Sequence, residues 1–286
     1  MDPRIIRLYD EYTHKPLERR VFLERLAVLA GSTAAAMTLL PVLENNYAQA
    51  AIVDPADPRV ATSTVTYKGA TGDIRAYLAV PKAGPPKRAG VIVIHENRGL
   101  TPYTQDLARR LAVAGFTGFA VDLLSPLGGT PANEDEARAA IGKLERTDAV
   151  RNLVAAAAYL KSRPDATGAV GAVGMCWGGG MTNLLAAAAP DLAAAVPFYG
   201  PVPPAADVPM IKAKLQLHYA GNDARLNAGI PGYEAALKAA RVPYEVFMYE
   251  GAEHAFHNDT GAARYNKAAA DLAWSRTIAF FKANLK

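Results

Sequence analysis

Short apolar runs alternate with helical patterns along most of this chain. Two early segments, 62–67 and 75–80, alternate apolar and polar residues, which is typical of antiparallel strands with one solvated face. The segment 90–94 is a continuous apolar run of the kind that a buried parallel strand requires. The other predicted strands cover 117–121, 169–173, 193–199, 215–219 and 244–249. Helical patterns lie between or after them, over 103–114, 134–160, 181–189, 233–240 and 262–282. This alternation predicts an α/β fold with a mostly parallel central sheet and helices on both faces.

The first 50 residues have the order of regions found in an export signal. Arg19-Arg20-Val21-Phe22-Leu23 resembles a twin-arginine signature, a moderately apolar stretch runs from Leu26 to Leu43, and Ala48-Gln49-Ala50 has the pattern of a cleavage site. We therefore expect residues 1–50 to be a leader and residues 51–286 to form one domain, located in the periplasm or secreted. An uncleaved cytosolic helix and a membrane anchor are the alternatives. Because a membrane span needs about 20 strongly apolar residues, we expect no stable membrane insertion once the leader is removed.

Composition and charge exclude several classes of function. The chain has 286 residues, of which 51% are hydrophobic and 20% charged, as in a globular protein. The net charge is +4, but Lys and Arg are scattered, so we expect no nucleic-acid partner. A single cysteine excludes an intramolecular disulfide and any all-cysteine metal site within one chain. The sequence does not indicate an oligomeric state.

That single cysteine, Cys176, occupies the centre of Gly174-Met175-Cys176-Trp177-Gly178-Gly179. The pattern is the nucleophile turn of α/β-hydrolases, in which a strand turns sharply into a helix and small neighbours leave room for the turn. Free cysteine is more often plain buried packing. The predicted strand before the motif and the predicted helix after it favour a nucleophile instead, presented at a helix N-terminus that stabilises a thiolate.

A cysteine nucleophile needs a base, and the base needs an orienting carboxylate. His254 directly follows the predicted strand 244–249, so it is the candidate base, with His257 as a weaker rival. Asp223 follows a glycine turn after the strand 215–219 and is the candidate acid. The alternative acids are Asp207 and Asp259.

Hydrolysis of an ester also needs backbone donors for the oxyanion. We expect them to be the amides of Trp177 and Asn97, the second of which follows the predicted strand 90–94. Glu96 lies beside Asn97, either at the mouth of the cleft or in a surface ion pair with Arg98. Aromatic residues that are candidates to line an apolar pocket, although each is more often core, are Tyr103, Trp177, Phe198 and Tyr199.

Taken together, these segments resemble the dienelactone hydrolase family, which includes carboxymethylenebutenolidase. The matching motifs fall in the family's order: 95–99, 174–179, 221–223 and 251–256. The resemblance implies an α/β-hydrolase fold, a Cys176–Asp223–His254 triad, no cofactor and no metal. It also implies that Glu96 contacts the resting thiol and helps it to ionise when substrate arrives.

The sequence departs from the family where arginines bind the substrate carboxylate. Leu124-Ser125-Pro126 and Phe256-His257-Asn258-Asp259 occupy those two places and contain no arginine. The candidate substrate contacts are then Arg98, Arg225, His257 and Asn258, besides the aromatic residues. We expect a small-molecule lactone or carboxylic ester to be hydrolysed through a thioester. An exported small-molecule-binding protein that keeps the fold is the alternative, and the reactivity of the thiol would distinguish the two.

Overall fold

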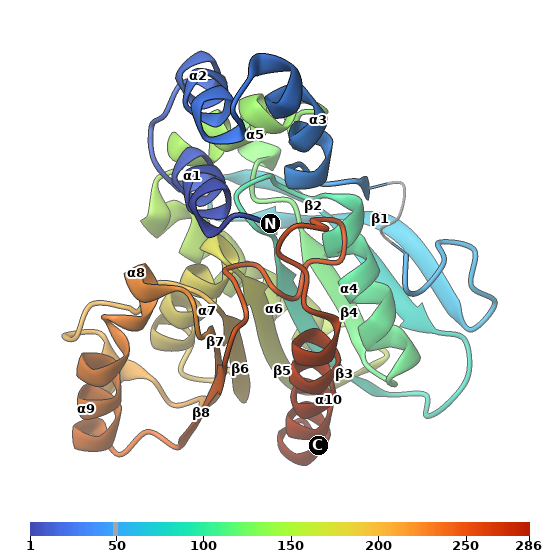
Figure 1. Cartoon of the computed structure of the whole chain (residues 1–286). Helices are drawn as coiled ribbons and strands as arrows, with labels where there is room; N and C mark the ends of the chain where they lie inside the picture. The colour runs from blue at the N-terminus through green and yellow to red at the C-terminus, as the bar shows by residue number, and fades with distance from the viewer. Residues whose placement is uncertain (48–50) are drawn as a thin grey trace.

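An eight-stranded mixed sheet forms the centre of the computed structural model, which describes residues 1–47 and 51–286 (Figure 1). In chain order the strands are β1 (Val60–Gly69), β2 (Gly72–Pro81), β3 (Arg88–Ile94), β4 (Thr117–Val121), β5 (Ala166–Met175), β6 (Ala194–Phe198), β7 (Lys214–Ala220) and β8 (Tyr244–Tyr249). Their order across the sheet is β1-β2-β4-β3-β5-β6-β7-β8. β2 pairs antiparallel with β1 and β4, and every other neighbouring pair is parallel. The predicted α/β class and mostly parallel sheet are confirmed.

Helices cover both faces of the sheet because its central strands are apolar on both sides. Every residue of β4 and β6 is buried, as the continuous apolar runs predict. One apolar core joins the sheet to α4 (Pro102–Val113) and α10 (Lys267–Asn284). The other core lies between the sheet and α6 (Arg146–Ser162), α7 (Trp177–Ala188) and α9 (Ile230–Ala240).

Some helix boundaries differ from those expected. The segment 134–160, which we expect to be largely helical with possible breaks, consists of two helices, α5 (Glu134–Gly142) and α6. A short helix that the pattern does not predict, α8 (Ala224–Asn227), follows β7. Helix α10 begins at Lys267 instead of residue 262, because the side chain of Asn266 accepts a hydrogen bond from the Ala269 amide and caps the helix there. Residues 262–266 therefore belong to the loop that follows the site.

The N-terminal residues form three helices, which lie together at one end of the molecule beside α5 (Figure 1). They are α1 (Pro3–His14), α2 (Arg19–Ala30) and α3 (Thr33–Leu43). The predicted apolar stretch 26–43 is broken at Gly31, whose φ is 84°, and at Ser32, which caps α3. No single helix among residues 1–47 and 51–286 is long and apolar enough to cross a membrane. Helices α2 and α3 together have the length and composition, but the pair is bent by 111°.

These three helices have an apolar cluster of their own, here called the N-terminal cluster. Its buried members are Ile5, Leu8, Tyr9, Tyr12, Phe22, Leu26, Ala36, Leu40 and Leu43. The cluster is separate from the two cores of the sheet, and Ala263 of the domain packs against it. Arg138 and Arg264 lie over the rings of Tyr12 and Tyr9. The expected cleavage site at 48–50 lies outside the described residues, and cleavage and export stay predictions.

Candidate active site

The site lies where four parallel strands end. The loop 95–99 follows β3, Cys176 follows β5, Asp223 follows β7 and His254 follows β8. Because parallel strands have their carboxyl ends at the same edge of a sheet, residues from four distant parts of the chain meet there.

The backbone at Cys176 has the strained geometry of a nucleophile turn. Its φ is 55° and ψ is −117°, outside the regions that residues with a side chain ordinarily adopt. A Cβ on Gly174 would lie 2.2 Å from the Gly178 carbonyl oxygen, and one on Gly178 would lie 2.4 Å from the Ile94 oxygen. Glycine is therefore required on both sides of the turn, and the turn holds the sulfur at the start of α7.

A buried carboxylate orients His254. Its Nδ1 lies 2.5 Å from Asp223 Oδ2, and both side chains are about 5% exposed or less. This arrangement leaves His254 Nε2 without a hydrogen bond among the described residues. That nitrogen lies within 4.8 Å of Cys176 Sγ. The rival base His257 bonds to Tyr103 instead, with 2.7 Å between the hydroxyl and Nδ1.

A second histidine, His14, contacts the thiol from helix α1. Its Nε2 lies 3.1 Å from Cys176 Sγ, and its ring packs edge-on against that of His254 with the centroids 4.6 Å apart. On the other side of the ring, Nδ1 lies 2.8 Å from the Asp10 carbonyl oxygen and 3.1 Å from Asp10 Oδ1. The sulfur is thus flanked by two imidazoles, each paired with a carboxylate.

Charges around the sulfur favour the thiolate. Burial alone would raise the pKa of Cys176, but the neighbouring His14 and His254 outweigh burial and bring the pKa well below its usual value. Burial alone would lower the pKa of His254, but the Cys176 thiolate and Asp223 outweigh burial and raise the pKa to about 10. The same balance raises the pKa of His14. All three shifts are in the direction that favours a thiolate paired with imidazolium.

Glu96 is partly buried near the thiol, and it lines the same small cavity as Cys176. Its Oε2 accepts a hydrogen bond of 2.7 Å from Asn258 Nδ2, and Oε1 has no partner among the described residues. Burial and the nearby thiolate raise the pKa of Glu96 to about 7. No hydrogen bond joins Glu96 to Cys176 among the described residues, and the side chain that contacts the sulfur is His14.

The expected oxyanion donors lie on either side of the sulfur. The Trp177 amide is in the first turn of α7, where an N–H has no acceptor within the helix. The Asn97 amide follows β3, and neither N–H makes a hydrogen bond within the described part of the chain. Both residues line the cavity at Cys176.

A cavity of about 690 Å³ opens beside the thiol. Of the residues predicted to contact substrate, Trp177, Tyr199 and Arg225 line it. Those predicted contacts that do not line it are Arg98, Tyr103, Phe198, His257 and Asn258. Phe198 is fully buried against His218, and Arg98 pairs with Glu134 at 3.3 Å.

Several residues of the site escaped sequence reasoning. Asp10 and His14 fall within the expected leader. Arg138 and Arg146 lie in helices that carry no motif. His14 and both arginines nevertheless line the cavity. One signal was available: Asp2-Pro3 is a good helix start, and apolar residues recur every three or four positions up to His14.

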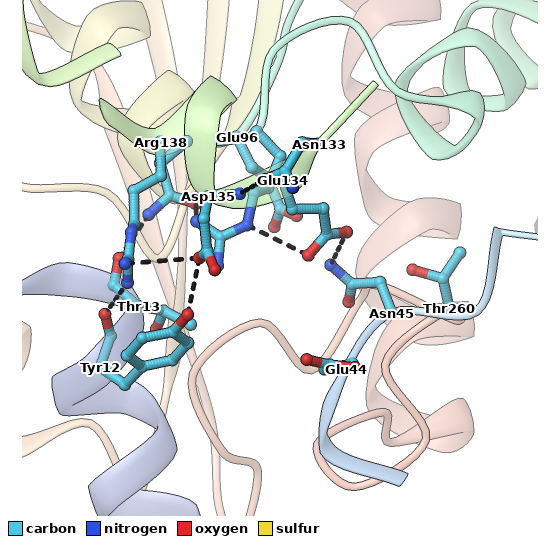
Figure 2. A network of polar contacts seen from close by, with 12 residues as sticks. Tyr12, Thr13, Glu44, Asn45, Glu96, Asn133, Glu134, Asp135, Arg138 and Thr260 are labelled. Carbon is cyan, nitrogen blue, oxygen red and sulfur yellow. Dashed lines mark hydrogen bonds and ion pairs between the residues drawn. The ribbon is translucent and has the colours of Figure 1, made fainter. Parts of the chain in front are cut away.

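Polar contacts hold α1 against α5. Figure 2 shows Tyr12 and Thr13 facing Asp135 and Arg138. The Tyr12 hydroxyl donates to Asp135 Oδ1 at 2.6 Å, and the Arg138 guanidinium donates to the Tyr12 carbonyl oxygen. Asn97 Nδ2 donates to the Thr13 carbonyl oxygen at 2.7 Å, which fixes the end of α1 directly over the site.

Two imidazole nitrogens and the cysteine sulfur lie close enough together to bind one metal ion. These atoms of His14, His254 and Cys176 all lie within 4.8 Å of one another. Imidazole nitrogen and thiolate sulfur are the donors that Zn²⁺ takes, and ligating histidines commonly bond to a carboxylate through the other nitrogen. The group could therefore capture such an ion, although the hydrolysis of an ester by a thiolate requires none.

Comparisons with known proteins identify relatives of this chain. The model of the "Dienelactone hydrolase family" matches residues 74–285. A "Putative carboxymethylenebutenolidase" of Saccharolobus solfataricus is 30% identical over 76% of this chain and 97% of its own length. A protein of the same name from Methylorubrum extorquens is 31% identical over 94% of this chain and 96% of its own. The crystal structure of a "Putative Dienelactone Hydrolase" from Klebsiella pneumoniae superposes with a TM-score of 0.71 at 26% identity, covering 78% of this chain and 98% of that one.

Proposed function

Because the chain belongs to the dienelactone hydrolase family, we propose that it hydrolyses a lactone or carboxylic ester through a thioester on Cys176. Membership of the family makes it a hydrolase that acts on a small molecule of this class. The cysteine mechanism rests on one observation above all. Cys176 lies at a strained strand–helix turn, beside a histidine that is bonded to a buried carboxylate at 2.5 Å.

Acylation begins with attack of the Cys176 thiolate on the carbonyl carbon. An S–C bond forms, and the electron pair of the C=O bond moves to oxygen, which the Trp177 and Asn97 amides stabilise. Each such donor contributes about 2.7–4 kcal/mol in comparable sites. When the C–O bond to the leaving group breaks, the protonated His254 gives its Nε2 proton to the departing oxygen.

Deacylation reverses these roles. Neutral His254 takes a proton from water, and the resulting hydroxide attacks the thioester carbon. The C–S bond then breaks, and the thiolate leaves with its electron pair. Asp223 keeps the Nδ1 proton of His254 in place throughout, so that Nε2 is the nitrogen that exchanges protons.

The cavity favours a substrate that carries negative charge. The cavity is lined by four basic residues, Lys15, Arg138, Arg146 and Arg225. Among the described residues that line it, Asp135 is the one with a carboxylate. Arg225 is 39% exposed and lies 3.7 Å from Asp10, so it can turn toward a ligand. These cations supply the positive charge that the sequence lacks at the family's arginine positions.

Replacement of the nucleophile tests the proposal. Cys176→Ala in the full chain should lose hydrolysis of activated esters such as p-nitrophenyl acetate, while Cys176→Ser keeps a small residual rate. A matched control is Met210→Ala, since Met210 is 61% exposed and is not one of the residues that line the cavity. Full ester hydrolysis by Cys176→Ala would exclude the thioester mechanism.

A further inference from the structure

Helix α1 carries a second carboxylate–imidazole pair to the nucleophile. Asp10 and His14 are four residues apart, so both side chains lie on the same face of the helix. His14 Nε2 lies 3.1 Å from Cys176 Sγ. His254 Nε2, by contrast, has no hydrogen-bond partner among the described residues. His14 itself is mostly buried, with 15% of its side chain exposed.

The contacts around this pair hold it in position from three sides. Asn97, from the loop after β3, binds the Thr13 carbonyl oxygen next to His14. Arg225, after β7, lies 3.7 Å from Asp10 Oδ2. On α1 itself, the Thr13 hydroxyl lies 3.0 Å from His14 Nδ1. The end of α1 is therefore seated in the site by elements that also carry catalytic groups.

We propose that His14 is a catalytic residue, which with Asp10 forms the ion-pair partner of the Cys176 thiolate and makes the N-terminal segment part of the active site. The proposal deepens the function proposed above and rests on it. It assigns to residues 1–47 a role that nothing in the sequence motifs indicates.

Two histidines allow a division of labour at the sulfur. The thiolate is the attacking group in acylation and the leaving group in deacylation, so it is stabilised by a cation that stays charged through both steps. His14 holds its proton and supplies that cation. His254 gives a proton to the leaving oxygen and takes one from water, so the number of protons balances over the cycle without a change on His14.

The proposal has a direct consequence for the N-terminus. Cleavage after Ala50 would remove His14 and Asp10, so the active enzyme keeps its N-terminal helices if the proposal holds. The 31% identity to the Methylorubrum extorquens protein covers 94% of this chain, and it therefore extends into residues 1–50. A related sequence thus has a counterpart to part of this segment.

Titration of the single thiol tests the proposal without any substrate. We would compare wild type, His14→Gln, Asp10→Asn and Glu11→Gln, each in the full chain, by thiolate absorbance and by the rate of alkylation with iodoacetamide between pH 4 and 10. Glu11→Gln is the matched control: it makes the same chemical change one residue from Asp10, at a side chain whose ion pairs are with Lys15 and Arg25.

The expected result is a specific change in the alkylation profile. His14→Gln should raise the pKa of Cys176 by at least about one unit, which is roughly a tenfold slower alkylation at pH values below both pKa values. Asp10→Asn should shift it in the same direction by less, and Glu11→Gln should leave it unchanged. Both active-site variants should lower kcat on p-nitrophenyl acetate with little change in KM.

An unchanged alkylation profile in His14→Gln, with a wild-type circular dichroism spectrum, would overturn the proposal. Asp10→Asn carries the test alone if His14→Gln does not fold, because it removes the carboxylate without touching the sulfur; an unchanged profile there would then overturn the proposal. If His14→Gln shifts the alkylation profile but Cys176→Ala keeps full ester hydrolysis, the thioester mechanism is refuted and the contact between His14 and the thiolate is not. The two failures are therefore distinguishable.

Discussion

Asp223→Asn should weaken catalysis by removing the carboxylate that orients His254. The side chains lie 2.5 Å apart, with 3% and 5% of their surfaces exposed, so solvent screens the interaction little. An amide is the same size but carries no charge, and it can present an N–H where the histidine also presents one. The imidazolium is then less stable, and the tautomer with a free Nε2 is no longer favoured.

The expected loss follows from the strength of this bond. A hydrogen bond to a charged group contributes about 1.5–3 kcal/mol. At 1.36 kcal/mol per pKa unit, this lowers the pKa of His254 by roughly one to two units from its value of about 10. The same free energy, lost from the transition state, lowers kcat/KM by roughly 10- to 150-fold.

The assay is the pH profile of kcat/KM on p-nitrophenyl acetate. Asp207→Asn is the matched control, because Asp207 was the rival acid in the sequence and its side chain makes no capping hydrogen bond in the structure. It should behave as wild type. An equal loss in both variants, or no loss in Asp223→Asn, would refute the reasoning.

Three further predictions concern charge around the thiol. The pKa of Glu96 is raised from 4.5 to about 7, so its protonated carboxyl stabilises the fold below pH 4.5, and this contribution of about 3 kcal/mol is lost as pH rises through 7. At pH 8 the Glu96→Gln variant should therefore unfold at a higher urea concentration than wild type. Equal unfolding midpoints would contradict this. Micromolar Zn²⁺ should inhibit ester hydrolysis reversibly, with relief by a chelator and at least about tenfold weaker inhibition in His14→Gln, since the ion loses one of three ligands; inhibition of equal strength in both proteins would exclude the site. Arg146→Gln should raise KM severalfold for an ester with a carboxylate but not for a neutral one, since Arg146 lines the cavity; equal effects on both substrates would show that its charge does not act on the ligand.

The sheet and the order of the site residues were predictable because they depend on local patterns. The run 90–94 is continuous and apolar and 117–121 is nearly so, which predicts strands covered on both faces, and their residues are buried in the structure with the exception of the partly buried Arg88 at the start of β3. Cys176, Asp223 and His254 each follow a predicted strand, so the parallel sheet brings them to one edge. Glycines around Cys176 marked the turn because no larger residue fits there.

The N-terminal segment was not predictable in the same way. Arginines followed by an apolar stretch describe an export signal, and the same composition also builds short helices that pack on one another, such as α2 and α3. The place of His14 depends on contacts with distant residues, such as that between Thr13 and Asn97. Nothing near His14 in the sequence indicates which surface α1 covers.

The cavity shows a similar limit for the substrate contacts. Tyr103 in α4 and Phe198 at the end of β6 lie in the expected region, but both are buried in the apolar core and do not line the cavity. Arg138 and Arg146 reach the cavity because α5 and α6 pass along its rim. The direction of a side chain at a helix or strand end is set by packing, which the sequence pattern does not specify.

Identification of the acylated residue tests the central claim most directly. The full chain is mixed with excess p-nitrophenyl acetate, quenched in acid during turnover and digested for mass spectrometry, with His254→Ala used to slow deacylation. The account predicts one acetyl group, labile to hydroxylamine, on the peptide that contains Cys176, and none in Cys176→Ala. An acetyl group on another residue during turnover, or undiminished turnover in Cys176→Ala, would contradict it.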